Sequence, residues 1–161
     1  GSEMCIRDSR NYLAEFLPFV EHTNKVEDSK TFIQSSLQQF ARGDGFHCGI
    51  WYDQKLVGVI GLHYLDLVNK RTSIGYYLAE DFQKKGIMTR CTKALIQYVY
   101  EEYDINRIEI RMSTKNKKSR AIPIRRGFTQ EGILRSNERL QGEFSDSYVF
   151  SLLREECTYN R

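Results

Sequence analysis

The chain has 161 residues, of which 40% are hydrophobic and 28% are charged, and its formal net charge is +3. This size allows one domain with its own hydrophobic core, and the composition is ordinary for a soluble globular protein. So small a net charge does not by itself indicate a nucleic-acid-binding protein. No apolar run approaches the ~20 residues that span a bilayer, and no secretory signal peptide is recognisable.

The cysteines give no indication of a metal site. The chain has four of them, at Cys5, Cys48, Cys91 and Cys157, and none forms a C-x-x-C pair. Three scattered histidines add no zinc-ligand spacing. We therefore expect no metal, and free buried thiols in a cytoplasmic protein, with disulfides as the alternative.

The first residues do not fit the rest of the chain. Gly1-Ser2 is typical of a cloning remnant, and the EMCIRDS that follows matches no later pattern. We interpret residues 1–9 as a remnant of cloning or sequence assembly, and residues 10–161 as one domain.

The N-terminal part of that domain has helical periodicity. Apolar residues recur at helical spacing between residues 10 and 22, with an interruption at Pro18. A second helix is predicted to begin with Asp28 or Ser29 as its N-cap and to end near Gly43.

From residue 46 onward the period changes to two, which indicates β-strands. Three antiparallel strands are predicted as a meander over 46–52, 55–67 and 71–80. A helix from Gly86, a strand over 107–112 and a helical stretch within the basic segment 115–127 follow. Two last strands are predicted over 128–140 and 144–153. These elements predict a single α+β domain with a mainly antiparallel central sheet flanked by helices.

The segment DFQKKGIMTR lies between a predicted strand and a predicted helix. The first N–H groups of a helix lack internal partners, and that end of the helix carries partial positive charge. Gly86 permits close backbone approach, while Lys84 and Lys85 add cationic charge, so the segment suits a phosphate or pyrophosphate. It matches neither the Walker A loop nor the dinucleotide fingerprint. A capped surface helix with solvated lysines is the alternative.

The order IGYYLAEDFQKKGIMTRCTKAL, then RIEIRMSTKNKKSRAIPIRRGFTQEGILR, resembles the GNAT family of acetyl-CoA-dependent N-acetyltransferases. The similarity is greatest to the Rim-type branch, which acetylates the N-termini of ribosomal proteins, and it runs from about residue 11 to 153. In that family a Q/R-x-x-G-x-G/A loop holds the coenzyme A pyrophosphate. The resemblance therefore implies a pyrophosphate site on Gln83, Lys84, Lys85, Gly86, Ile87, Met88 and Thr89. Met88 departs from the pattern, because the family often has glycine or alanine there.

The same resemblance implies further site residues. Backbone groups of Ile74, Gly75 and Tyr76 would pair with the pantetheine arm, and Asn116 would bond the pantetheine or thioester region. Ser119 and Glu138 match the family's proton donor and base. For these two, a capping serine and a solvated strand glutamate are the alternatives.

One feature of the family is missing or replaced. The family fold opens with a strand before its first helices, which EMCI would have to provide here. Otherwise the strand over 46–52 has an open edge, and such an edge favours pairing with a second copy of the chain.

We therefore expect an enzyme that moves an acetyl group from acetyl-CoA to a primary amine, foremost the N-terminal α-amine of a protein, including ribosomal proteins. A small amine as acceptor and a non-catalytic acyl-CoA-binding module are the alternatives. A nucleic-acid binder using KNKKSR lacks a recognition motif. Neither nucleic acid nor membrane is an expected partner.

Overall fold

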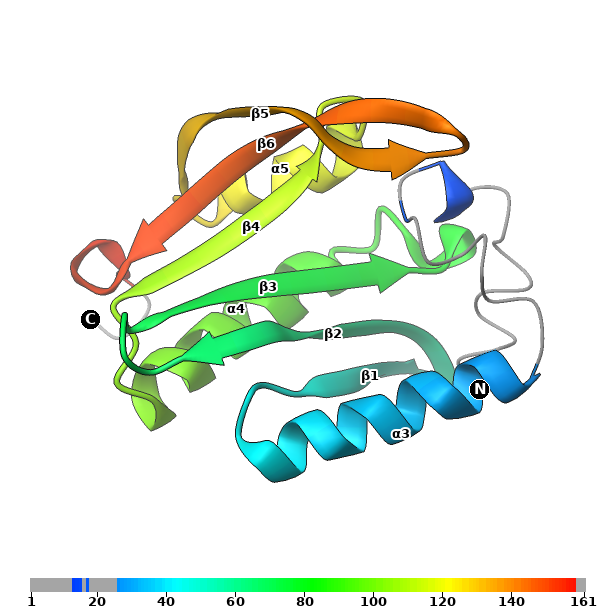
Figure 1. Cartoon of the computed structure of the whole chain (residues 1–161), viewed down its shortest axis with the longest axis horizontal. Helices are drawn as coiled ribbons and strands as arrows, with labels where there is room; N and C mark the ends of the chain where they lie inside the picture. Colours follow the sequence, from blue (N-terminus) through cyan, green and yellow to red (C-terminus); the bar gives the residue numbers. More distant parts are fainter. Residues whose placement is uncertain (1–12, 16, 18–25, 159–161) are drawn as a thin grey trace.

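The computed structural model describes residues 13–15, 17 and 26–158 (Figure 1). The strands and helices that the sequence predicts between residues 46 and 153 are all present, with bounds that differ by a few residues. The elements in chain order are α3 (Val26–Arg42), β1 (His47–Tyr52), β2 (Lys55–Asp66), β3 (Arg71–Leu78), η2 (Glu80–Phe82), α4 (Ile87–Glu102), β4 (Arg107–Ser113), α5 (Lys117–Arg125), β5 (Thr129–Leu140), β6 (Glu143–Leu153) and η3 (Arg154–Glu156).

The strands form one six-stranded sheet in the order β1-β2-β3-β4-β6-β5. Every neighbouring pair is antiparallel except β3 and β4, which run parallel. The predicted α+β fold with a mainly antiparallel sheet is therefore confirmed. The parallel ladder is short, because it joins only 71–74 of β3 to 107–110 of β4. Beyond that ladder the two strands diverge, as Figure 1 shows.

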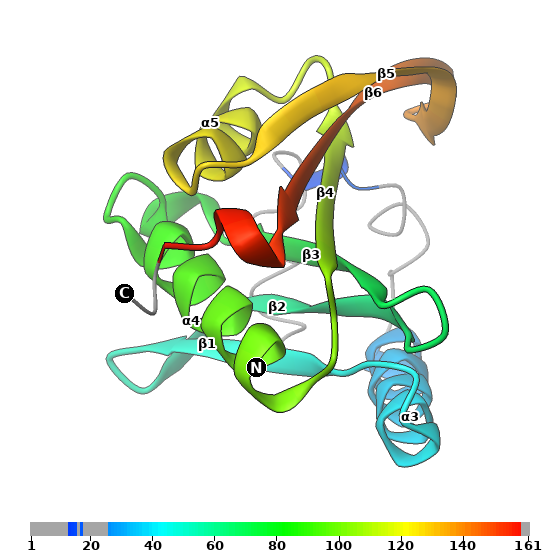
Figure 2. The ribbon, with the colours of Figure 1, turned by 90° about the vertical axis from the view of Figure 1, so that its left-hand side faces the viewer.

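Helices cover both faces of the sheet. Figure 2 shows α4 and α5 on one face and α3 on the other. The apolar stripe of α4 packs on the sheet in the main core, where Ile96, Val99 and Ile108 are fully buried and Ile74 and Ile110 nearly so. This core holds α4 against the face of the sheet that includes β3. The first turn of α4 therefore lies near the point where β3 and β4 separate.

Helix α3 differs from its prediction at the start. Asp28 and Ser29 lie inside the helix, so neither is its N-cap. The helix attaches to the sheet through Gln39, whose Nε2 donates to the carbonyl oxygens of Leu62 and His63 at 3.2 and 3.0 Å. Those carbonyls lie at a register shift of β2, where the ladder to β3 is interrupted. The predicted helix over 10–22 and any first strand fall largely outside the described residues.

The thiols are less buried than the sequence predicts. Cys48 is exposed, while Cys91 and Cys157 are half-buried, and all three are free. In the ranges that the structure describes, no group of three or more metal-ligating side chains is close enough to hold an ion. No described helix is long and apolar enough to cross a membrane.

Candidate active site

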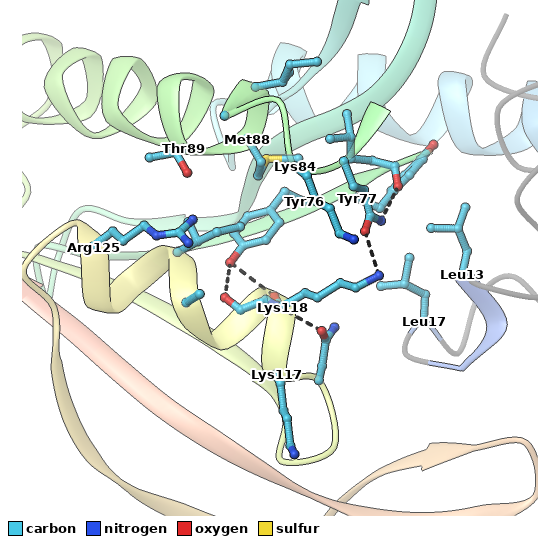
Figure 3. A pocket seen from close by; sticks show the side chains of 18 residues that line it. Leu13, Leu17, Tyr76, Tyr77, Lys84, Met88, Thr89, Lys117, Lys118 and Arg125 are labelled. Carbon is cyan, nitrogen blue, oxygen red and sulfur yellow. Dashed lines mark hydrogen bonds between the residues drawn. The ribbon is translucent and has the colours of Figure 1, made fainter. Parts of the chain in front are cut away.

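A cavity of about 540 Å³ lies beside the C-terminal half of β3, between the first turn of α4 and helix α5 (Figure 3). Most of the residues that the sequence predicts for the site contribute to its wall. Those residues are Tyr76, Gln83, Lys84, Gly86, Ile87, Met88, Thr89, Asn116 and Ser119.

Four predicted residues do not line this cavity. Ile74 is 1% exposed and belongs to the main core, and Gly75 lies next to it on β3. The side chain of Lys85 places Nζ 5.1 Å from the ring centroids of Tyr52 and Phe82, outside the cavity wall. The fourth is Glu138, which lies on β5.

The loop before α4 has the geometry of an anion site. Gly86 is the N-cap of α4 and has a left-handed backbone (φ 70°). The left-handed backbone, and not a lack of space, explains why this residue is a glycine. The nearest atom to an added Cβ would be the flexible end of the Arg90 side chain, at 3.3 Å. The N–H groups of the first helical turn therefore begin at the cavity wall, beside Lys84. Met88 is 6% exposed and packs into the core while still contributing to the wall.

Gln83 and Lys118 link the two sides of the cavity mouth. Lys118 Nζ donates to Gln83 Oε1 at 3.3 Å, and Gln83 Nε2 donates to the carbonyl oxygen of Leu78 at 3.3 Å (Figure 3). With Lys84 and Arg125 also in the wall, the mouth carries several cationic side chains. This charge suits a ligand with more than one phosphate.

The cavity reaches both faces of the sheet. Successive strand residues point to opposite faces. Tyr76 packs against the main core on the α4 side, whereas Tyr77 packs with Leu13 and Leu17 on the other side. All four of these residues line the cavity. The cavity therefore extends through the opening where β3 and β4 separate.

Ser119 is held at the start of α5 by two neighbours. Asn116 is the N-cap of α5, and its Oδ1 accepts a hydrogen bond from the backbone N–H of Ser119 at 3.0 Å. Ser119 Oγ donates to the hydroxyl of Tyr76 at 3.3 Å. The capping residue is thus Asn116 and not Ser119. Contact of Asn116 with a ligand remains a prediction.

Glu138 follows an irregularity in β5. The β5–β6 register shifts between Leu134 and Glu138, and Ser136 has a positive φ of 49°. The backbone N–H of Ser136 donates to Asp146 Oδ1 at 2.8 Å, which fixes this bulge. Bulges redirect the side chains that follow them. Within the described residues, Glu138 Oε2 is buried without a hydrogen-bond partner, and burial raises the pKa of this carboxyl group.

Ser119 and Glu138 lie on opposite faces of the sheet. Glu138 pairs with Ser145 of β6, and Ser145 alternates along that strand with the core residues Phe150 and Leu152. Glu138 therefore faces away from α4 and α5. Ser119 belongs to α5 and bonds Tyr76 on the core side. Ser119 therefore lies on the α4–α5 side of the sheet and in the cavity wall, whereas Glu138 lies on the other side and outside that wall.

The prediction missed several residues of the wall. Lys118, Ile122 and Arg125 recur at helical spacing in α5, so one face of that helix meets the cavity. Lys118 and Arg125 belong to the basic segment 115–127, and the i, i+4, i+7 spacing that they form with Ile122 was available in the sequence as a sign of one shared helix face. Leu13 and Leu17 also line the cavity, but no pattern in the sequence indicates that role.

The separation of β3 from β4, the glycine at the start of α4 and the cationic cavity mouth together suit an elongated ligand that carries phosphates. The sequence profile of the acetyltransferase (GNAT) domain matches residues 5–129. YdaF of Bacillus subtilis is 37% identical over 156 residues, which cover 96% of this chain and 85% of that protein.

Two solved structures are also similar. RimL, a ribosomal L7/L12 α-N-protein acetyltransferase in complex with coenzyme A, superposes with a TM-score of 0.92 at 25% identity, covering 96% of this chain and 88% of that one. MccE, the microcin C7 self-immunity acetyltransferase in complex with acetyl-CoA and AMP, gives 0.90 at 32% identity, with 94% and 84% covered. The chain belongs to the GNAT acetyltransferase family, and it is an acetyl-CoA-dependent N-acetyltransferase.

Proposed function

We propose that this enzyme acetylates the N-terminal α-amine of a protein, with ribosomal proteins as the first class of acceptor to test. The observation that carries the proposal is the cavity that passes through the opening between β3 and β4. A co-substrate on the α4–α5 side and an amine on the other side can meet there. RimL, which shares this fold, is an α-N-protein acetyltransferase.

With contacts from all of its residues except Lys85, the loop 83–89 would hold the pyrophosphate of acetyl-CoA at the first turn of α4. Its N–H groups and partial positive charge favour an anion there by ~0.3–1 kcal/mol. Backbone groups of residues 74–76 would pair with the pantetheine arm, since Ile74 is the last residue of the ladder to β4 and residues 75 and 76 have no β4 partner in the sheet. Asn116 lines the same cavity and would contact the pantetheine or thioester region. Lys85 would support the loop by packing on Tyr52 and Phe82 instead of touching the ligand.

Two side chains would then carry out the proton transfers of the reaction. The Glu138 carboxylate accepts a proton from the attacking amine and releases it to solvent. As the C–N bond forms and the C–S bond breaks, the electron pair of the broken bond goes to sulfur. The Ser119 hydroxyl gives its proton to this sulfur and is reprotonated from solvent. The raised pKa of Glu138 makes it a stronger base than an ordinary glutamate.

The chemistry of the two amines in proteins favours an N-terminus as acceptor. An α-amino group has a pKa of about 7.7–8.0, against ~10.4 for lysine. At pH 7 the neutral fraction is therefore a few hundredfold larger for the α-amine. One carboxylate base suits the acceptor that is more easily deprotonated.

The test is a comparison of acceptors with acetyl-CoA as the donor. We expect peptides with a free N-terminus to react faster than N-blocked lysine peptides or small amines, with mass spectrometry locating the acetyl group on the α-nitrogen. Faster acetylation of the lysine peptides would contradict the proposed acceptor. Preference for a small amine would favour the alternative, an enzyme that acetylates a small molecule.

Assembly and location belong to the same proposal. Strand β1 is at the edge of the sheet formed by the described residues, so we propose that two copies can pair along it. We place the enzyme in the cytoplasm, where the three free thiols would remain reduced.

A further inference from the structure

The Ser119 hydroxyl contacts a residue 43 positions earlier in the chain. The hydroxyl of Tyr76 donates to the carbonyl oxygen of Ser119 at 3.2 Å, and Ser119 Oγ donates to the Tyr76 hydroxyl at 3.3 Å. Figure 3 shows both contacts inside the cavity. With the bond from its N–H to Asn116, Ser119 is held at its nitrogen, its carbonyl oxygen and its hydroxyl.

This arrangement differs from that of other helical hydroxyls in the protein. Thr31, Ser36 and Thr92 each donate to the carbonyl oxygen four residues earlier in the same helix, at 2.8, 2.9 and 2.8 Å. Such bonds to the same helix are one common state of serine and threonine inside helices. Ser119 lies in the first turn of α5, so the residue four positions earlier, Lys115, precedes the helix. Ser119 instead bonds to strand β3, across the cavity that α5 and β3 enclose.

Tyr76 is well placed to fix this geometry. It lies two residues beyond the end of the β3–β4 ladder, where β3 pairs only with β2 in the sheet. Its ring packs against the main core, so its hydroxyl has little freedom to move. A phenol in this position lines the cavity and reaches Ser119 from β3.

We propose that Tyr76 is a positioning residue for Ser119, holding its hydroxyl in the cavity and donating a hydrogen bond to Ser119 Oγ as that oxygen gives its proton to the departing sulfur. This inference rests on the proposed role of Ser119 as proton donor. Hydroxyl hydrogens rotate freely, so the phenol hydrogen can turn from the Ser119 carbonyl to Oγ. The phenol keeps its own proton throughout, and the proton that reaches sulfur comes from Ser119.

The environment of Tyr76 agrees with a role as a neutral donor. Burial raises the pKa of its phenol well above the ordinary value, and the bond to Ser119 opposes that shift only in part. The phenol therefore remains protonated at every pH at which the enzyme would act. A tyrosine that released its proton as the primary acid would be favoured by a lowered pKa, which is the opposite of what the site provides.

The test is a double-mutant cycle of Tyr76→Phe and Ser119→Ala. We expect Tyr76→Phe to lower kcat by about 10-fold, the effect of one lost hydrogen bond in the transition state, and to leave the KM for acetyl-CoA within about twofold. In the Ser119→Ala background the same substitution should have no further effect, because a positioning residue acts only through its partner.

Other results would overturn the inference in distinguishable ways. If Ser119→Ala slows the enzyme but Tyr76→Phe does not, or if their effects multiply, Tyr76 does not act through Ser119. If Ser119→Ala has wild-type turnover, the proposed role of Ser119 fails, and this inference with it. Tyr98→Phe is the control, because Tyr98 is 47% exposed on α4 and lies outside the cavity wall. Thermal unfolding and calorimetric coenzyme A binding of each variant separate a chemical effect from a folding defect.

Discussion

The two ends of strand β5 hold two glutamates in opposite electrostatic environments. Glu131, near the start, accepts hydrogen bonds from Arg107 at 2.6 Å on each oxygen and from Ser151 at 2.8 Å. These partners, Arg107 foremost, lower the pKa of Glu131 to about 2. Glu138, near the other end, has a buried oxygen without a partner in the described residues, and burial raises its pKa.

The difference shows that one strand can carry a carboxylate with a structural role at one end and a carboxylate suited to accept a proton at the other. Glu131 is saturated with donors, so its carboxylate is a poor base and serves to join β5 to β4 and β6. Glu138 has the same functional group without those donors, and its carboxylate gains more from accepting a proton. A buried carboxylate oxygen without a hydrogen-bond partner costs stability when the group is ionised, and a role as a base would account for its presence here.

The largest expected effect is on catalysis. Glu138→Gln should lower turnover with an N-terminal peptide at pH 7 by about 10²–10⁴-fold, because the amide has the same shape but cannot accept the proton of the amine. The rate of thiol release from acetyl-CoA measures the loss.

Glu131→Gln is the matched control for that experiment. It is the same substitution on the same strand, and we expect its turnover to remain within about threefold of wild type, as for changes away from a site. Equal losses in both variants would mean that the integrity of β5 determines activity. Wild-type turnover of Glu138→Gln would show that the base is a different group.

The pH dependence should separate the two glutamates further. Wild type loses its advantage over Glu138→Gln as the pH falls through the raised pKa of Glu138, since the carboxyl group is then protonated and cannot act as a base. The advantage should also shrink above about pH 8, where the α-amine loses its proton without help. The ratio of the two kcat/KM values is therefore expected to be greatest between these limits. A ratio that does not change with pH would contradict the role of a base, whereas Glu131→Gln should show no such maximum.

Local patterns predicted most of the fold and the loop of the site. The period-two alternation of residues 46–52 and the glycine before α4 are each patterns of neighbouring residues, so the sequence alone was sufficient to predict a strand and a helix start there. The position of the Lys85 side chain could not be predicted in the same way. Lys84 has a positive φ of 63°, and the residue types in this loop do not indicate that conformation. That backbone conformation is part of the turn that leaves Lys84 in the cavity wall and Lys85 over two aromatic rings.

Contacts between distant parts of the chain could not be predicted. The bond between Tyr76 and Ser119 depends on how α5 packs beside β3, and no spacing encodes it. The bulge before Glu138 breaks the period-two pattern without a glycine and depends on Asp146 from the neighbouring strand. Family resemblance indicated Ser119 and Glu138, whereas the structure supplies the physical reason why their environments differ from those of ordinary surface residues.

The smallest expected effect is on stability, and its sign should differ between the two glutamates. At pH 7, Glu131→Gln should lower the unfolding free energy by about 1 kcal/mol, because it removes a charged partner of Arg107. The value is small because the Glu131 side chain is 42% exposed. Wild type has this advantage above the unfolded pKa of ~4.3 and loses it as the pH falls toward 2, the folded value. Glu138→Gln should instead raise the unfolding free energy by about 1 kcal/mol, since the buried carboxylate costs stability when ionised.

The gain from Glu138→Gln must itself depend on pH. A carboxyl group whose folded pKa lies above its unfolded value costs nothing at low pH, where it is protonated in both states. It destabilises the fold progressively as the pH rises through the interval between the two values. Urea unfolding of both variants and wild type at pH 3.5 and pH 7.5 measures this difference. If Glu138→Gln lowers stability at both pH values, the carboxylate of Glu138 has stabilising partners, and the contrast between the two ends of β5 is wrong.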